Sequence, residues 1–417
     1  MNFDIISQKK FFDFESTLNV KIFFSVCKNI LGVIIMKYRE LGRTGLKVSE
    51  IGLGCEGFSE ENFSMCKKLF DVAEVEGVNY FDLYASNPKV RAAVGEAMKG
   101  RREKFIAQSH IGSIWKNDQY LRTRKISEVK AGFEESLKLL QTDYIDVGTI
   151  HYCDDLKDWD QIVNGGTLEY ARQLKKEGII KHIGLSSDNP LVALEAVESG
   201  AIEVLMFSVN PCYDLQPANE DVEQLWAPEN YENQLTNMDK DRQRLYETCQ
   251  RLGVGITVMK CFGGGDLLDA KLSPAGVALT ANQCIHYALS RPAVAVVLAG
   301  AHSVEQFKNS IAYENATDEE KDFATAFASF PRINWTGHCM YCSHCAPCVK
   351  KIDIATVTKF LNLTIAQKIV PETVREHYKV LDHHAGECIQ CGVCETRCPF
   401  GVEIRQNMKK AADVFGY

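Results

Sequence analysis

Short apolar runs alternate with longer amphipathic stretches between residues 51 and 299. One such stretch spans residues 122–140, where apolar side chains recur every three or four positions and so share one helix face. Eight strand–helix units over about 250 residues predict a closed parallel barrel, the TIM (β/α)8 fold. The eight predicted strands are 51–54, 78–82, 105–110, 144–151, 179–186, 203–209, 254–260 and 294–299.

The segments around these units have other patterns. An open doubly wound sheet is the alternative fold, but no G-x-G-x-x-G follows the first strand. Residues 38–48 predict a hairpin that closes the bottom of the barrel, and 211–238 a long insertion of the kind that covers substrates. The apolar run near the N-terminus is broken by Lys21 and Lys28, so we interpret residues 1–35 as an extension preceding Met36, with an amphipathic anchor as the alternative.

Composition narrows the class of protein. A chain of 417 residues exceeds one ordinary core, so we expect a barrel over 36–330 and a second domain over 337–417. The net charge of -8 and the lack of a basic stripe argue against nucleic acid as a partner, and no segment predicts a membrane span. Eight of the 16 cysteines lie in runs with metal-binding rather than disulfide spacing, which points to a reducing cytoplasm.

Two cysteine quartets lie near the C-terminus. The second, CIQCGVCETRCP, has the C-x2-C-x2-C-x3-C-P spacing of a bacterial ferredoxin run for a [4Fe-4S] cluster. The first departs from it in the spacing of its last cysteine and in Val349, where proline would follow. Two all-thiolate zinc sites are the alternative. We predict two [4Fe-4S] clusters, with the fourth cysteine of each run crossing to the other cluster: Cys339, Cys342, Cys345 with Cys398, and Cys388, Cys391, Cys394 with Cys348.

Four barrel motifs carry a family resemblance. GVNYFDLYA, TDYIDVGTIHY, KHIGLSS and GAHSVEQFKNSI, in this order, resemble the aldo/keto reductases, here with a ferredoxin-like domain appended. The resemblance covers residues 37–309 for the barrel and 339–415 for the clusters. It implies hydride transfer between a nicotinamide and a carbonyl or alcohol. It also implies a tetrad of tyrosine, lysine, aspartate and histidine, in which the lysine and the aspartate lower the pKa of the tyrosine.

Only part of that tetrad carries over to this sequence. Asp82 and His151 match the family aspartate and histidine, whereas Asn87 stands at the tyrosine position and His110 at the lysine position. Tyr84 is the only nearby phenol in the sequence. We hypothesise that His110 and His151 share acid/base duty, because imidazole titrates near neutrality, with Asp82 holding one imidazolium and Tyr84 donating to the substrate oxygen. The alternative is a site that has decayed or been repurposed.

The resemblance also suggests how a nicotinamide would bind. Glycines after the seventh strand permit close approach of the backbone to a pyrophosphate, and residues after the eighth strand match the adenosine segment. The departures leave NADH, NADPH or no nicotinamide open. The implied cofactor contacts are Ser186, Ser187, Asn210, Lys260, Gly263, Gly264, Gly265, Gly300, Ser303 and Gln306.

The barrel and the cysteine-rich domain would transfer different numbers of electrons at a time. A hydride carries two electrons whereas a [4Fe-4S] cluster passes one, so a flavin or another intermediate would normally join them, and a flavin remains open. The clusters would accept electrons from ferredoxin or another carrier, or would brace the fold. We expect an iron–sulfur oxidoreductase acting on a small carbonyl or alcohol metabolite. The alternatives are an electron-transfer protein or scaffold with a vestigial site, and a lyase or isomerase that uses the retained acid/base residues.

Overall fold

The computed structural model describes residues 34–417, apart from 56–57, 59–62, 217, 220–234, 237, 275, 329–332, 335–336, 338, 368–369 and 371. The predicted N-terminal extension lies almost wholly outside the described residues, as does most of the insertion at 211–238. None of the helices in the described part of the chain is long and apolar enough to cross a membrane.

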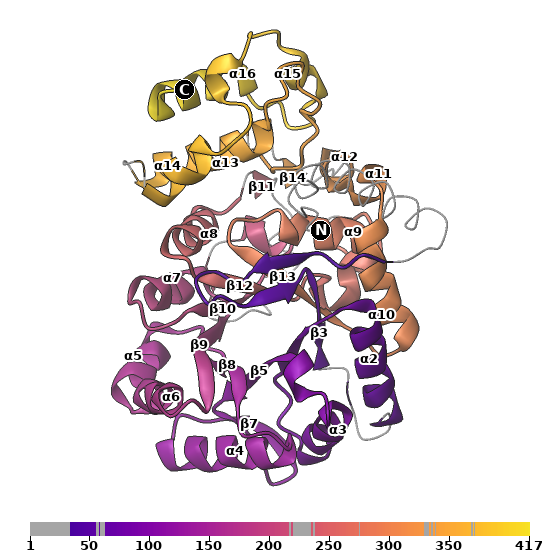
Figure 1. Ribbon diagram of the computed structural model, residues 1–417, viewed down its shortest axis with the longest axis vertical. Helices are drawn as coiled ribbons and strands as arrows, with labels where there is room; N and C mark the ends of the chain where they lie inside the picture. Colours follow the sequence, from indigo (N-terminus) through magenta and orange to yellow (C-terminus); the bar gives the residue numbers. More distant parts are fainter. Residues whose placement is uncertain are drawn as a thin grey trace, which may run out of the picture.

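Eight parallel strands close into a barrel, so the predicted TIM-type fold is confirmed (Figure 1). Each barrel strand coincides with one of the eight apolar runs, within two residues at each end. These runs are continuously apolar because helices cover the outside of the barrel and side chains fill the inside. The strands, in order around the barrel, are β3 (Ile51–Gly54), β4 (Tyr80–Leu83), β5 (Ile106–Ile111), β8 (Ile145–Ile150), β9 (Ile180–Ser187), β10 (Val204–Ser208), β12 (Gly255–Met259) and β13 (Val294–Gly300).

The helices that connect these strands in the sequence cover the outside of the barrel. Helix α4 (Ile126–Leu139) presents the predicted apolar face inward, with Val129 and Phe133 buried. The other helices of this layer are α2 (Phe63–Glu76), α3 (Pro88–Met98), α5 (Leu156–Asn164), α6 (Thr167–Lys176), α7 (Pro190–Glu198), α8 (Lys240–Leu252), α9 (Ala281–Leu289), α10 (Val304–Ile311), α11 (Asp318–Lys321) and α12 (Phe323–Ala328).

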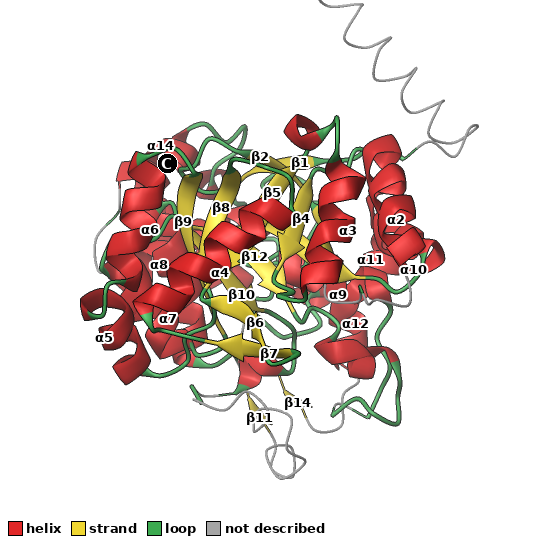
Figure 2. Cartoon of the chain, turned by 90° about the horizontal axis from the view of Figure 1, so that it is seen from below, coloured by secondary structure: helices red, strands yellow, loops and turns green. Residues whose placement is uncertain are grey.

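A short hairpin covers one end of the barrel, as the sequence predicts. Strands β1 (Tyr38–Glu40) and β2 (Lys47–Ser49) pair antiparallel. Arg39 fixes the hairpin to the barrel wall by donating to Glu50 at 2.7 Å and to the carbonyl of Leu289 at 2.7 Å. Figure 2 shows this hairpin at one end of the barrel and a second hairpin at the other end. The carboxyl ends of the barrel strands, and the site they carry, lie at that other end.

That second hairpin is a departure from the sequence prediction. Strands β6 (Ser113–Lys116) and β7 (Gln119–Arg122) lie where the sequence predicts no element, and α4 begins at Ile126, four residues after the predicted helix start at Arg122. Asn117 and Asp118 form the two-residue turn with φ of 54° and 56°. Asparagine and aspartate tolerate this left-handed conformation better than most residues, which allows the tight turn without glycine.

The C-terminal domain is largely helical around the cysteine runs. It contains α13 (Ile354–Gln367), α14 (Glu372–Lys379), α15 (Val393–Arg397) and α16 (Ile404–Phe415). Helix α13 contacts α8 of the barrel, and buried Arg291 donates to the carbonyl of Met340 at 2.6 Å. In Figure 1 this domain lies beside α8 and α12, whereas α3 and α4 lie on the opposite side of the barrel.

Candidate active site and cluster sites

A line of hydrogen bonds crosses the mouth of the barrel. His110 on β5 joins Asp82 of β4 through Nε2, at 2.9 Å from Oδ1. Its Nδ1 lies 2.7 Å from Nδ1 of His151, the residue directly after β8. Nε2 of His151 in turn bonds the hydroxyl of Tyr120 on β7. Three residues that the sequence singled out thus form one hydrogen-bonded chain, Asp82–His110–His151, and Tyr120 is its last member; we call it the histidine chain.

Buried polar neighbours hold Asp82 in place. Gln108, which pairs with Asp82 across β4 and β5, donates to Oδ1 at 2.7 Å. The Gln108 carbonyl oxygen accepts from the hydroxyls of Tyr80 at 2.8 Å and Thr257 at 3.3 Å. Each bond defines the next group's orientation, and Gln108 and Thr257 are fully buried. The carboxylate is therefore a fixed acceptor for His110.

Two protonation patterns satisfy the whole chain. A carboxylate only accepts, so His110 carries hydrogen on Nε2. With neutral rings, Tyr120 donates to Nε2 of His151, and Nδ1 of His151 donates to His110. With one additional proton, His110 donates from both nitrogens and His151 donates to the Tyr120 oxygen. The chain can take up or release one proton without losing a hydrogen bond.

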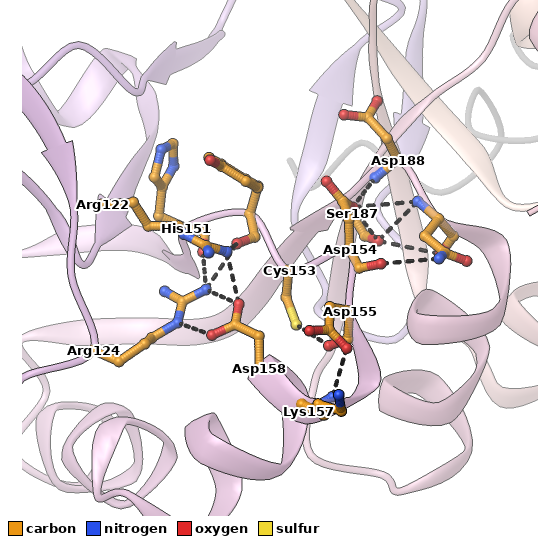
Figure 3. A network of polar contacts seen from close by, with 12 residues as sticks. Arg122, Arg124, His151, Cys153, Asp154, Asp155, Lys157, Asp158, Ser187 and Asp188 are labelled. Carbon is orange, nitrogen blue, oxygen red and sulfur yellow. Dashed lines mark hydrogen bonds and ion pairs between the residues drawn. The ribbon is translucent and has the colours of Figure 1, made fainter. Parts of the chain in front are cut away.

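Arginines tie down the backbone that carries His151. Arg124 donates to the carbonyl of His151 at 2.8 Å and pairs with Asp158 of α5, while Arg122 donates to the same carboxylate at 2.7 Å. Figure 3 shows the imidazole of His151 pointing away from these guanidinium groups. Burial first, and then His110 and Arg124, lower the pKa of His151 well below its ordinary value. His151 therefore resists holding a positive charge itself.

Tyr84 and Asn87, which the family resemblance also singled out, have different surroundings. The ring of Tyr84 lies 6.3 Å from that of His110 and 6.2 Å from that of His151, between centroids. Asn87 is the N-cap of α3 and accepts from the backbone of Lys89. The position expected for the family tyrosine is thus used to start a helix.

The expected cofactor residues divide into two groups. Gly263, Gly264 and Gly265 follow β12 with φ of 58°, 71° and 108°, and a side chain at either of the last two would meet nothing within 4 Å. Ser303 caps the N-terminus of α10, where Gln306 accepts from the backbone of His302. Gly300 ends β13. An open glycine turn and a helix N-terminus are each features that fit a phosphate group.

The residues expected around a carboxamide, and Lys260 at the rim of the glycine turn, are engaged with the protein itself. Ser187 donates to Asp154 at 2.9 Å, Asn210 donates to the carbonyl of Lys260 at 3.0 Å, and Lys260 pairs with Asp188 at 2.7 Å. Figure 3 shows Ser187, Asp154 and Asp188 grouped together. Burial and the nearby Asp188 raise the pKa of Asp154 to about 6. Ser186 is buried on β9. These four predicted contacts fit a bound cofactor less directly than the glycine turn does.

The cysteines line two hollows in the C-terminal domain. Cys348, Cys388, Cys391 and Cys394 border a hollow of about 490 Å³, and Cys339, Cys342, Cys345 and Cys398 border a much smaller one of about 20 Å³, with Cys345 reaching both. This grouping follows the crossed pattern. Among the described side chains, no three His, Cys, Asp or Glu converge closely enough for a single ion. Sulfurs spread around a hollow suit a multi-iron cluster better than one zinc.

Sequence reasoning missed Tyr120 and Gln108. The signal for Tyr120 was present as two short runs, SIWK and QYLR, separated by the turn pair Asn117-Asp118. Gln108 lies two residues before His110 on β5, and its side chain therefore points to the same side as that of His110. Neither pattern alone indicated a contact with the histidines.

The fold and site define a class: a parallel (β/α)8 barrel with acid/base residues at the carboxyl ends of its strands and a cysteine-rich domain attached. The aldo/keto reductase family model matches residues 50–283, more than half of the chain, and the protein belongs to this family. A 4Fe-4S dicluster domain model matches residues 338–403. The family resemblance noted in the sequence is confirmed.

Relatives support the same assignment. The uncharacterized oxidoreductase YqkF of Bacillus subtilis is 28% identical over 308 residues, which cover 68% of this chain and 94% of that protein. L-galactose dehydrogenase of Arabidopsis thaliana is 29% identical over 41% of this chain and 56% of its own length. The holo form of aldo-keto reductase AKR11C1 from Bacillus halodurans superposes with a TM-score of 0.54, at 25% identity, covering 69% of this chain and 94% of that chain. The protein is an oxidoreductase.

Proposed function

We propose that this protein interconverts a small carbonyl compound and the corresponding alcohol, with His110 and His151 exchanging the proton. The observation that supports this most directly is the hydrogen-bonded chain from Asp82 to His151. Because the chain accommodates one proton more or less, it can serve both directions of the reaction. Asp82 accepts a hydrogen bond from Nε2 of His110 at 2.9 Å and so fixes the orientation of that ring.

A nicotinamide, when bound, would supply or accept the hydride. The glycine turn Gly263–Gly265 would hold its pyrophosphate and the N-terminus of α10 its adenosine side, with Gly300, Ser303 and Gln306 as contacts. Helix N-termini and left-handed glycines both present backbone N–H groups to anions. Ser186, Ser187 and Asn210 would line the carboxamide end of the cofactor, and Lys260 would add a charge at the rim near its pyrophosphate.

Two [4Fe-4S] clusters would occupy the two hollows of the C-terminal domain, each held by three cysteines of one run and one of the other. Their domain lies beside α8, on the far side of the barrel from α3 and α4 (Figure 1). This position favours exchange of single electrons with a separate carrier such as ferredoxin over direct delivery to a substrate at the histidines.

Two measurements test the proposal. The protein purified without oxygen should contain about eight irons and eight sulfides per chain, and bound nicotinamide and flavin are quantified in the same sample. His110→Ala and His151→Ala should each lower the reduction of an aldehyde such as 4-nitrobenzaldehyde by roughly 10²- to 10⁴-fold. Unchanged turnover in both variants would show that the histidines do not carry the chemistry.

A further inference from the structure

The second hairpin brings a phenol to the histidine chain. Tyr120 lies on β7 opposite Trp115 of β6, and its hydroxyl bonds Nε2 of His151. Its side chain is 39% exposed, whereas His151 is only 4% exposed. Tyr120 is therefore the member of the chain that a molecule entering from solvent can contact.

Three contacts fix this hairpin at the barrel mouth. Arg122, two residues after Tyr120, donates to the carbonyl of Tyr152 at 3.0 Å and to Asp158 at 2.7 Å. The backbone N–H of Thr123 donates to the carbonyl of Gly112 at 2.9 Å, closing the base of the hairpin. These bonds hold the hairpin to the end of β8 and to α5. Arg122 therefore positions Tyr120 and also holds the backbone of Tyr152, the residue after His151.

We propose that Tyr120 is the catalytic residue that exchanges a proton with the substrate oxygen, and that the exchanged proton comes to rest on His110 beside Asp82. The inference rests on the proposed function and assigns a residue and a path to it. The phenol of a different loop thus takes the place of the tyrosine that is missing at Asn87.

The path balances for alcohol oxidation. The alcohol O–H bond breaks and its proton passes to the Tyr120 oxygen, while the proton of Tyr120 passes to Nε2 of His151 and the Nδ1 proton of His151 to Nδ1 of His110. The carbinol C–H bond breaks with its electron pair, as a hydride that an oxidised nicotinamide accepts. Carbonyl reduction runs through the same bonds in reverse. His110 ends as an imidazolium facing Asp82 at 2.9 Å.

The surroundings favour transfer through Tyr120 rather than storage on it. Burial, and the neighbouring phenols Tyr152 and Tyr84, raise the pKa of Tyr120 to about 12, so it stays a phenol near neutrality. The low pKa of His151 likewise makes that ring a poor place for a charge. Of the three rings joined by these hydrogen bonds, His110 is the one that faces a carboxylate, and the proton comes to rest there. The titratable and charged groups around the chain are Asp82, Tyr84, Arg91, Arg122, Arg124 and Tyr152.

Histidine NMR tests this path without needing the substrate. Holo protein labelled with ¹⁵N-histidine is compared with Tyr120→Phe and with Tyr152→Phe, a matched control that is 37% exposed and also adjacent to the ring of His151. We expect His151 to carry hydrogen on Nδ1 at neutral pH. Only Tyr120→Phe should move its Nε2 signal downfield, because that nitrogen loses its donor. Unchanged His151 signals in Tyr120→Phe would overturn the proposal.

Turnover separates the proposal from the proposed function. With 4-nitrobenzaldehyde and NADPH or NADH, Tyr120→Phe should lower kcat by roughly 10²- to 10⁴-fold with little change in KM, and Tyr152→Phe should match the wild type. Full kcat in Tyr120→Phe would overturn the proposal. If the wild-type protein reduces no aldehyde or ketone, the proposed function fails, and the histidine signals still decide whether Tyr120 ends the chain.

Discussion

Replacing Asp82 by asparagine tests the electrostatic basis of the site. The substitution keeps the shape of the side chain. In the wild-type protein, the donors of Gln108 and His110 lie 2.7 and 2.9 Å from Oδ1 of Asp82, and the amide oxygen of asparagine can still accept from both. What disappears is the negative charge beside a protonated His110. The fold should persist while the charged form of the chain becomes harder to reach.

The size of the effect follows from this geometry. A hydrogen bond to a charged group contributes about 1.5–3 kcal/mol. Since about 1.4 kcal/mol corresponds to a factor of ten in rate, Asp82→Asn should lower kcat for carbonyl reduction by roughly 10- to 100-fold. KM should change little, because the carboxylate lies behind the histidines and is 2% exposed.

The assay is steady-state reduction of 4-nitrobenzaldehyde under anaerobic conditions, with iron content and circular dichroism as checks on folding. Asp146→Asn serves as a comparison, because it removes another buried carboxylate, one that pairs with Arg102 and Lys181 and contacts neither histidine. A folded Asp82→Asn protein with wild-type kcat would refute the role of His110 as the resting place of the proton.

Three further predictions concern the clusters and the barrel. In the double variant Cys339→Ser, Cys398→Ser, crossed ligation leaves about four irons per chain by metal analysis, whereas near-complete loss of iron would favour separate runs. Gly95→Ala should lower the free energy of unfolding by about 1–3 kcal/mol in denaturant titrations, because its Cβ would lie 2.4 Å from a backbone oxygen of α4; Gly54→Ala, with no contact under 3.7 Å, should change it less. Burial raises the pKa of Glu247 to about 7, so its ionisation opposes folding as pH rises from about 4.5 to 7. Glu247→Gln should therefore match the wild type below pH 4.5 and be more stable by about 1–3 kcal/mol above pH 7, and equal stabilities at pH 8 would contradict this.

The barrel could be predicted from the sequence because its strands are buried on both sides. Parallel strands covered on both sides need continuous apolar runs, and helices between them need a single apolar face. Both patterns are strong in this chain, and the eight runs became the eight barrel strands. The cysteine spacing was equally direct, because four ligands within a short run depend little on the rest of the fold.

The site could be predicted only in part, because one of its residues reaches it through tertiary packing. Asp82, His110 and His151 follow or end strands, so barrel geometry alone brings them to one mouth. Tyr120 reaches His151 only because a hairpin folds back over that mouth and is held there by Arg122. The hairpin's turn contains Asn117 and Asp118 rather than glycine, so it lacks the usual sequence signal of a tight hairpin turn, and the sequence predicts no element over residues 113–121. Contacts of this kind depend on tertiary packing rather than on local pattern.

The central claim is that the barrel transfers a hydride to a carbonyl carbon. The most direct test is an anaerobic single turnover of the holo protein with a small aldehyde and a reduced nicotinamide that carries deuterium at both C4 positions, followed by mass spectrometry of the alcohol. We predict one deuterium on the carbinol carbon. An alcohol without the label, or no alcohol at all, would contradict the account, since electrons arriving through the clusters would bring hydrogen from solvent instead.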